Sequence, residues 1–338
     1  MGISASNKIY EADWLYTFLR PYVDWFFRRS FRRYRLIGKE NLPSDGVYIY
    51  APNHTHGLID ALAVLGIDRQ PKVFAARADI FRKRGQAKVL RWLKILPISR
   101  VRDGLKAVRN NTGTFVEAVS TLQAGVPFCI LPEGTHRPKH SLLPLSKGIF
   151  HIALQAYRAF GQDKPVYIVP VGIEYGDYEH LWDAILIRIG SPMPIVPSSE
   201  LTEPQQLLAW QEELTRRMRE LILYVPDDEH YEQAWAKLKA NKPLPWRDMD
   251  KPRLSNPLRI SLLTITLPLF VGCALLCAPM GILILYLRHK IQDPAFKDSV
   301  QYVVQLLLCS AALLLPLPLW QFIQEYIYQC RHIKTAIR

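Results

Sequence analysis

Unbroken apolar runs alternate with amphipathic stretches through the first two thirds of the chain. The apolar runs predict five strands, at residues 47–51, 73–76, 127–131, 166–173 and 186–189. Runs without polar alternation are typical of strands that are covered on both faces. Residues 104–122 and 148–160 show the periodicity of helices between these strands. We therefore expect an α/β domain at residues 41–200, with a mostly parallel sheet and crossover helices.

Two long apolar stretches follow this domain. Residues 260–287 and 299–324 contain no Asp, Glu, Lys or Arg, and about 20 apolar residues suffice to cross a bilayer. Both stretches exceed the usual length of a helix in a soluble protein, which disfavours the alternative of two buried helices in a large soluble domain. We predict a C-terminal two-helix transmembrane hairpin at residues 259–325.

The segments on either side of this hairpin are polar. Residues 201–258 are predicted to contain an amphipathic helix, at 205–224, and a linker rich in Pro, Lys and Asp. Residues 326–338 form a basic tail.

The charges that flank the apolar stretches indicate an orientation. Seven basic residues lie near the outer ends of the predicted hairpin, namely Arg247, Lys251, Arg253, Arg259, Arg331, Lys334 and Arg338. Three lie in the connection between the stretches, namely Arg288, Lys290 and Lys297. Because Lys and Arg accumulate in cytoplasmic loops, we expect the α/β domain on the cytoplasmic face of the membrane and the connection on the opposite face.

The first 40 residues combine aromatic and basic side chains. The aromatic ones include Trp14, Tyr16, Phe18, Tyr22, Trp25, Phe26, Phe27 and Phe31, and the basic ones are Arg20, Arg28, Arg29, Arg32, Arg33 and Arg35. This mixture predicts an amphipathic helix on an anionic membrane surface. The alternative is a helix that packs its aromatic side chains on the domain and exposes its arginines.

The net charge points to the same kind of partner. The chain has 43 Lys and Arg against 30 Asp and Glu, a formal charge of +13, which favours an anionic partner. Since two membrane spans are predicted, we expect membrane lipids and not nucleic acid.

Residues 51–60 carry the first group of candidate catalytic side chains. They read Ala-Pro-Asn-His-Thr-His-Gly-Leu-Ile-Asp and follow a predicted strand directly. His54 can reach Asp60 if it lies in the turn before a helix, whereas His56 would share a helix face with Asp60. The sequence thus offers two His–Asp pairs, and a carboxylate that orients a neutral imidazole makes a general base for an alcohol.

A zinc site is the competing chemical interpretation of the same residues. His54, His56 and Asp60 would start it, and His136 or His140 would complete it. The sequence has no His-Glu-x-x-His motif, and its one close pair of cysteines, Cys273 and Cys277, lies one helical turn apart in an apolar run, where packing is expected. We therefore expect no metal.

Two further segments have the composition of an anion-binding site. Residues 131–137 read Leu-Pro-Glu-Gly-Thr-His-Arg at the end of a predicted strand, the place where α/β sheets usually bind ligands. Residues 96–100 read Leu-Pro-Ile-Ser-Arg, and the guanidinium of Arg100 suits a phosphate because it can donate two parallel hydrogen bonds. The alternative for residues 131–137 is an ordinary turn with a solvated Glu133. The alternative for residues 96–100 is a basic face exposed to solvent.

In their order and in their residues, these segments resemble the motifs of the glycerophosphate acyltransferase family. In that family an Asn-His pair is followed several residues later by Asp, and further along the chain by Pro-Glu-Gly-Thr. The resemblance covers residues 46–194 and includes Val-Pro-Val-Gly at 169–172. It implies that His54 is the catalytic base and Asp60 its partner. Five residues separate them, where the commonest family spacing is four. The longer spacing resembles the fungal-type glycerol-3-phosphate and dihydroxyacetone-phosphate acyltransferases.

The resemblance also implies an acceptor site made by Arg100, Glu133, Gly134, Thr135, Arg137 and Lys147. The family often has Arg directly after Thr; here His136 intervenes, so either His136 or Arg137 meets the phosphate.

The implied activity is that of an integral membrane O-acyltransferase in phospholipid biosynthesis. It would transfer a fatty acyl group from acyl-CoA or acyl-ACP, without another cofactor, to 1-acylglycerol-3-phosphate or glycerol-3-phosphate. Dihydroxyacetone phosphate and a lyso-aminolipid are alternative acceptors. A catalytically inactive membrane-binding scaffold is the alternative of another class, and the intact His54, Asp60 and Glu133 argue against it.

Overall fold

The computed structural model describes residues 8–11, 13–99, 111–161, 163–178, 182–241, 256–291, 294–311 and 316–334. Its helices are α1 (Trp14–Arg29), α2 (Leu58–Leu65), α3 (Arg84–Trp92), α5 (Thr112–Gln123), α6 (Gly148–Phe160), α7 (Glu203–Leu221), α8 (Tyr231–Asn241), α9 (Asn256–Lys290), α10 (Pro294–Ala311) and α11 (Pro316–Lys334). Its strands are β1 (Arg33–Ile37), β2 (Val47–Pro52), β3 (Val73–Arg77), β4 (Ile95–Ile98), β5 (Phe128–Cys129), β6 (Val166–Tyr175), β7 (Ala184–Ile189) and β8 (Met193–Pro194). Short 3₁₀ turns occur at Lys39–Asn41 and Ala78–Phe81.

The strands form one sheet in the order β1-β7-β6-β2-β5-β3-β4, with β8 paired to β6. β2 runs parallel to its neighbours β6 and β5, and β3 runs parallel to β5 and β4. β7 is parallel to β1 but antiparallel to β6, as is β8. The predicted α/β fold with a mostly parallel sheet is confirmed. Because β2 and β5 are parallel neighbours, the loops that leave their carboxyl ends begin side by side.

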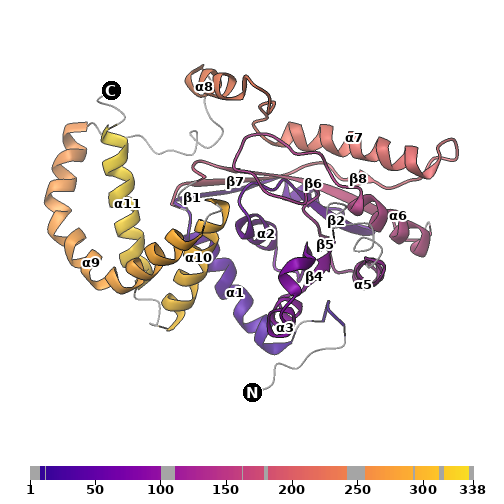
Figure 1. The fold of residues 1–338 in the computed structure, drawn as a ribbon, viewed down its shortest axis with the longest axis horizontal. Coiled ribbons are helices and arrows are strands. Elements are labelled where there is room, and N and C mark those ends of the chain that lie inside the picture. The colour runs from indigo at the N-terminus through magenta and orange to yellow at the C-terminus, as the bar shows by residue number, and fades with distance from the viewer. Residues whose placement is uncertain are drawn as a thin grey trace.

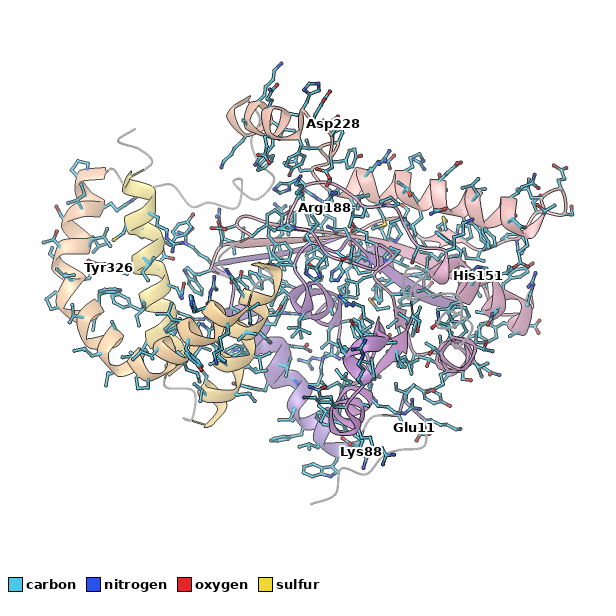
Figure 2. The ribbon with its side chains drawn as sticks, viewed as in Figure 1. Glu11, Lys88, His151, Arg188, Asp228 and Tyr326 are labelled. Carbon is cyan, nitrogen blue, oxygen red and sulfur yellow. The ribbon has the colours of Figure 1, made fainter. Side chains whose placement is uncertain are left out.

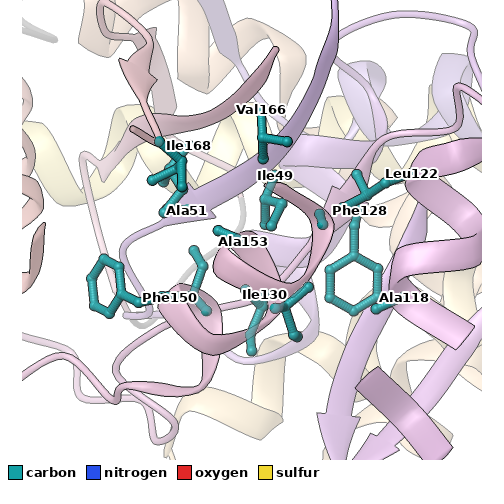
Figure 3. Close-up of a cluster of buried hydrophobic side chains, with 14 of the residues drawn as sticks. Ile49, Ala51, Ala118, Leu122, Phe128, Ile130, Phe150, Ala153, Val166 and Ile168 are labelled. Atoms are coloured by element: carbon teal, nitrogen blue, oxygen red, sulfur yellow. The ribbon is translucent and has the colours of Figure 1, made fainter. Parts of the chain in front are cut away.

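Helices cover both faces of this sheet (Figure 1). On one face, α5, α6 and α7 pack on side chains such as Ile49 and Val166, and Figure 3 shows Phe150 and Ala153 of α6 in this cluster. On the other face, α1, α2 and α10 pack on side chains such as Tyr50. The central strands are therefore buried on both sides, which explains why their sequences are apolar without alternation.

The strands missed by sequence analysis lie at the edges of the sheet. β1 alternates arginine with apolar residues, and β4 contains Pro97, a pattern that edge strands tolerate because one side of them has no partner strand. The predicted strand at 127–131 is paired only at Phe128–Cys129. Helix α5 begins at Thr112, and the start of the helix predicted at 104–122 lies outside the described residues. The predicted linker contains helix α8.

Helix α1 packs aromatic side chains on the domain, as the alternative interpretation of the N-terminal segment expects, but its Arg20 is buried as well. Its side chain Phe27 is 1% exposed and packs in the core with Phe26, whereas Trp14 and Phe18 are 74% and 73% exposed. The helix is thus anchored to the domain by its C-terminal half, and its N-terminal half presents aromatic side chains to the surroundings.

The C-terminal helices lie together beside the sheet (Figure 1). Tyr326 of α11, which is labelled in Figure 2, stacks on Phe270 of α9 with ring centroids 4.2 Å apart. Among the described helices, one passes the test of length and composition for a membrane span. It covers Pro257–Lys290, with a mean hydropathy of 2.3 in its most apolar window and 22% of that window buried.

The predicted transmembrane hairpin stays a prediction, because residues 312–315 in its second apolar stretch lie outside the described residues. The described parts of the second apolar stretch belong to α10 and α11, and α10 packs on the α/β domain through buried Tyr302, whose hydroxyl donates to Val23 O (3.4 Å). Asp298, placed by the prediction at the far side of the membrane, contacts His56 of the domain. A helix that packs on protein needs an apolar face just as a lipid-facing helix does, so the lack of charge in this stretch does not distinguish the two environments.

Candidate active site

The loop after β2 is held by Asn53. Its side chain continues the pairing of β2 with β6, since Nδ2 donates to Ile173 O (3.0 Å) and Oδ1 accepts from Ile173 N (2.6 Å). Asn53 is buried, so these bonds satisfy an amide that would otherwise be costly to bury. Gly57 then turns the chain into α2 with φ of 58°, a conformation that favours glycine. Both residues fix where the intervening histidines lie.

Asp60, in the first turn of α2, is the centre of this loop. It is fully buried. Its Oδ2 accepts from the backbone N–H groups of Thr55 (2.8 Å) and His56 (2.7 Å), and its Oδ1 accepts from the hydroxyl of Tyr175 (2.6 Å). Burial raises the pKa of this carboxyl, but the hydrogen bond and charge of His54 and the bond from Tyr175 outweigh it, so the pKa is lowered overall. The group is therefore an anion at neutral pH.

His54 points its Nδ1 at this anion. The distance from His54 Nδ1 to Asp60 Oδ2 is 2.9 Å, and the His54 side chain keeps 16% of its surface exposed. When Asp60 accepts from Nδ1–H, the neutral ring carries its lone pair on Nε2. The buried Asp60 carboxylate thus fixes the orientation of the His54 ring and leaves Nε2 as its basic nitrogen. Because part of the ring is exposed, a ligand can reach it.

His56 does not form the alternative pair. Only its backbone N–H contacts Asp60, while its ring nitrogen Nε2 lies 3.1 Å from Asp298 Oδ2. Burial lowers the pKa of His56, and the nearby Asp60 only partly offsets this. Within the described ranges, no group of three or more His, Cys, Asp or Glu side chains is arranged to hold a metal ion.

Glu133, after β5, holds the same loop from the other side. Its Oε1 accepts from His54 N (2.6 Å) and its Oε2 accepts from Leu143 N (2.8 Å). Gly134 forms the turn that follows, with φ of 64° and its N–H donating to Leu131 O (3.1 Å). Burial raises the pKa of Glu133 to about 7, against the lowering effect of these two hydrogen bonds. The two carboxyl groups thus act differently: one orients the His54 ring, and the other holds the His54 backbone.

The predicted acceptor residues converge only in part. His136 lies edge-to-face with His54, with ring centroids 5.2 Å apart, and Arg137 N donates to His54 O (3.2 Å). The guanidinium of Arg137 pairs with Asp227 and donates to Ser141 Oγ (2.7 Å). The segment after β5 therefore runs along the His54 loop, and the side chain of Arg137 is held just beyond it.

The remaining predicted acceptor residues lie around this segment. Thr135 is partly buried in the same loop. Lys147 is exposed at the start of α6, and its neighbour Ser146 donates its N–H to Pro132 O (2.7 Å). Arg100 lies outside the described residues.

Sequence reasoning missed three residues of this site. The sequence analysis assigned no role to the side chains of Asn53, Tyr175 and Asp298. Tyr175 ends β6, the strand beside β2, so its position at the carboxyl edge of the sheet was the available signal. Nothing local indicates Asp298, because its contact with His56 joins distant parts of the chain.

Comparison with known proteins found two similarities. The chain is similar to the crystal structure of the 1-acyl-sn-glycerophosphate acyltransferase PlsC from Thermotoga maritima, with 24% sequence identity and a TM-score of 0.43 over 60% of this chain and 80% of that one. A search of curated proteins found no match. Residues 33–174, which carry both the His54 loop and the Glu133 turn, match the sequence model of the Acyltransferase family.

Proposed function

We propose that this protein is a membrane-bound O-acyltransferase. It transfers a fatty acyl group from acyl-CoA or acyl-ACP to a hydroxyl of glycerol-3-phosphate or 1-acylglycerol-3-phosphate, in phospholipid biosynthesis. The observation that carries this proposal is the 2.9 Å contact of His54 Nδ1 with the buried Asp60, in a segment that matches the Acyltransferase family.

The geometry supplies what transfer to an alcohol needs. His54 Nε2 takes the proton of the acceptor hydroxyl as its oxygen bonds to the thioester carbonyl carbon. Asp60 stabilises the imidazolium that forms, as the carboxylate does in a serine-protease triad. The intermediate then expels the thiolate, which takes the proton from His54. The ester bond forms as the thioester bond breaks, and the base returns to its neutral form.

A covalent acyl-enzyme is not required for this reaction. The acceptor hydroxyl occupies the place that a nucleophilic serine has in a triad. Cys129, at the base of the Glu133 turn, is fully buried, and burial raises the pKa of its thiol. It is therefore a poor nucleophile, because the thiolate is the reactive form.

We propose further that Arg137 and Lys147, with Arg100, hold the phosphate of the acceptor, and that Glu133, Gly134 and Thr135 shape the turn around it. The support comes from the path of the chain, because Arg137 N donates to His54 O and so starts its side chain at the catalytic loop. Asp227 pairs with both Arg137 and Lys139 (2.6 Å to Lys139). A bound phosphate would replace Asp227 as the anionic partner of Arg137.

Membrane binding is the third part of the proposal. Helix α9 exposes a long apolar surface that includes Ile265, Leu275 and Leu276, each more than 70% exposed. The helices on either side contact the domain, since Trp235 of α8 stacks on His140 and Asp298 of α10 contacts His56. We infer that α9 embeds its exposed apolar surface in the bilayer from the cytoplasmic side without crossing it, so that both flanks of the helix stay on the cytoplasmic face.

The role of His54 is tested by its removal. His54→Ala should lower kcat by about 10²–10⁴-fold, since the general base is lost, while the circular dichroism spectrum stays that of the wild type. His230→Ala is the matched control, because His230 is an exposed surface histidine. Steady-state assay with acyl-CoA and glycerol-3-phosphate or its 1-acyl derivative measures both. A kcat for His54→Ala within a few-fold of the wild type would contradict the proposed base.

The role of Arg137 is tested by the kinetics of the acceptor. Arg137→Ala should raise the acceptor KM roughly tenfold to a hundredfold, because a hydrogen bond to a charged group contributes about 1.5–3 kcal/mol. The donor KM should not change, and Arg137→Lys should restore only part of the loss since it lacks the planar fork. Arg158→Ala, at an exposed pair with Glu203, is the control. Unchanged acceptor kinetics in Arg137→Ala would favour a lyso-aminolipid acceptor without phosphate.

Membrane binding and orientation are tested together with the exposed Cys330. The protein should stay in the membrane pellet after washing with alkaline carbonate. A membrane-impermeant maleimide should label Cys330 in sealed inside-out vesicles, but in right-side-out vesicles only after detergent is added. Cys330→Ala shows the background from the buried cysteines. Release by carbonate would rule out insertion of α9, and labelling in intact right-side-out vesicles would reverse the orientation.

A further inference from the structure

Helix α10 places a carboxylate against the catalytic loop. Asp298 Oδ2 lies 3.1 Å from His56 Nε2, and both side chains are 1% exposed. The other ring nitrogen of His56, Nδ1, is buried without a hydrogen-bond partner among the residues that the structure describes. The contact has the distance of an ion pair but is not a hydrogen bond, so Asp298 confines the His56 ring by close packing and by its charge, together with the side chains around the ring.

His56 is in direct contact with the groups that hold Asp60. Its backbone N–H donates to Asp60 Oδ2 (2.7 Å). Its ring stands edge-on to Tyr175, with centroids 4.7 Å apart and an interplanar angle of 88°. Tyr175 in turn donates its hydroxyl to Asp60 Oδ1 (2.6 Å). A displacement of the His56 ring would thus disturb the packing of Tyr175, whose hydroxyl helps to align Asp60 with His54.

Asp298 is itself fixed by helix α9. Arg288 Nη1 lies 2.6 Å from Asp298 Oδ1 and 2.7 Å from Gln301 Oε1. Arg288 balances the charge of Asp298, so the carboxylate can be buried beside a neutral His56. Helix α10 is also tied to α1, where Tyr22 donates its hydroxyl to Leu306 O (3.0 Å). A chain of contacts therefore leads from the end of α9 to the catalytic loop.

We propose that Asp298 is a positioning residue for acyl transfer: through His56 it holds the loop that aligns Asp60 with His54. This inference rests on the proposed function of the His54–Asp60 pair. It makes the C-terminal helices part of the active-site scaffold, and it couples the membrane-binding helix α9 to the catalytic base through Arg288.

Asp298→Asn tests the proposal, since it removes the charge and keeps the shape of the side chain. We expect kcat to fall at least about tenfold, because small misplacements of catalytic groups cost that much or more, while both KM values stay unchanged. Glu325→Gln is the matched control. It removes a carboxylate of α11 that pairs with Arg32 (2.8 Å) and lies outside the catalytic loop, so its kcat should match the wild type.

A double-mutant cycle shows whether Asp298 acts through His56. If it does, Asp298→Asn should lower kcat no further in a His56→Gln background. Losses that multiply, an unchanged kcat in Asp298→Asn, or a loss confined to KM would each overturn the proposal. If Asp298→Asn does not fold, Arg288→Gln takes its place, because it loosens the same carboxylate. A lower kcat at unchanged KM is again expected, and a wild-type kcat overturns the proposal.

A measurement without turnover separates this proposal from the proposed function. Diethyl pyrocarbonate should modify His56 slowly in the wild type and at least several-fold faster in Asp298→Asn, as followed by peptide mass spectrometry. Equal rates would show that Asp298 does not hold the ring and would overturn the inference. Failure of the wild type to transfer acyl groups to any acceptor would instead refute the proposed function.

Discussion

The burial of one negative charge organises the site. Asp60 is fully buried, and an ionised carboxylate is stable there only if hydrogen bonds and charge replace the lost water. Four groups do so: the amides of Thr55 and His56, the ring of His54 and the hydroxyl of Tyr175. They come from the loop after β2 and from the end of β6. The carboxylate therefore ties loop, helix and sheet into one arrangement, and the orientation of the base follows from it.

Local sequence patterns predicted the central strands and the places of His54 and Glu133, because both motifs follow directly on apolar runs. Spacing alone left His54 and His56 as alternative partners of Asp60. The structure distinguishes them through the turn at the end of β2, which no periodicity describes. Tyr175 was missed because its bond to Asp60 joins residues 115 positions apart. Such a pairing depends on which strands become neighbours, and that is a property of the whole sheet.

The C-terminal helices show a second limit of sequence patterns. Residues 299–311 lack charge, and the same composition suits a helix in lipid and a helix packed on protein. The structure places this helix on the domain, with Asp298 and Gln301 buried at its start. Only α9 among the described helices keeps the length and exposure expected of a segment in a bilayer. Whether an apolar helix is exposed, as α9 is, or packs on the domain, as α10 does, depends on tertiary contacts that amino-acid composition alone does not determine.

The central claim is that the buried Asp60 carboxylate makes His54 a general base, and Asp60→Asn tests it most directly. The asparagine has nearly the same shape, so the fold is retained, but it cannot stabilise an imidazolium by its charge. We predict that kcat for transfer from acyl-CoA falls by about 10²–10⁴-fold at unchanged KM values, in protein with the circular dichroism spectrum of the wild type. A folded Asp60→Asn protein with kcat within about threefold of the wild type would contradict the claim.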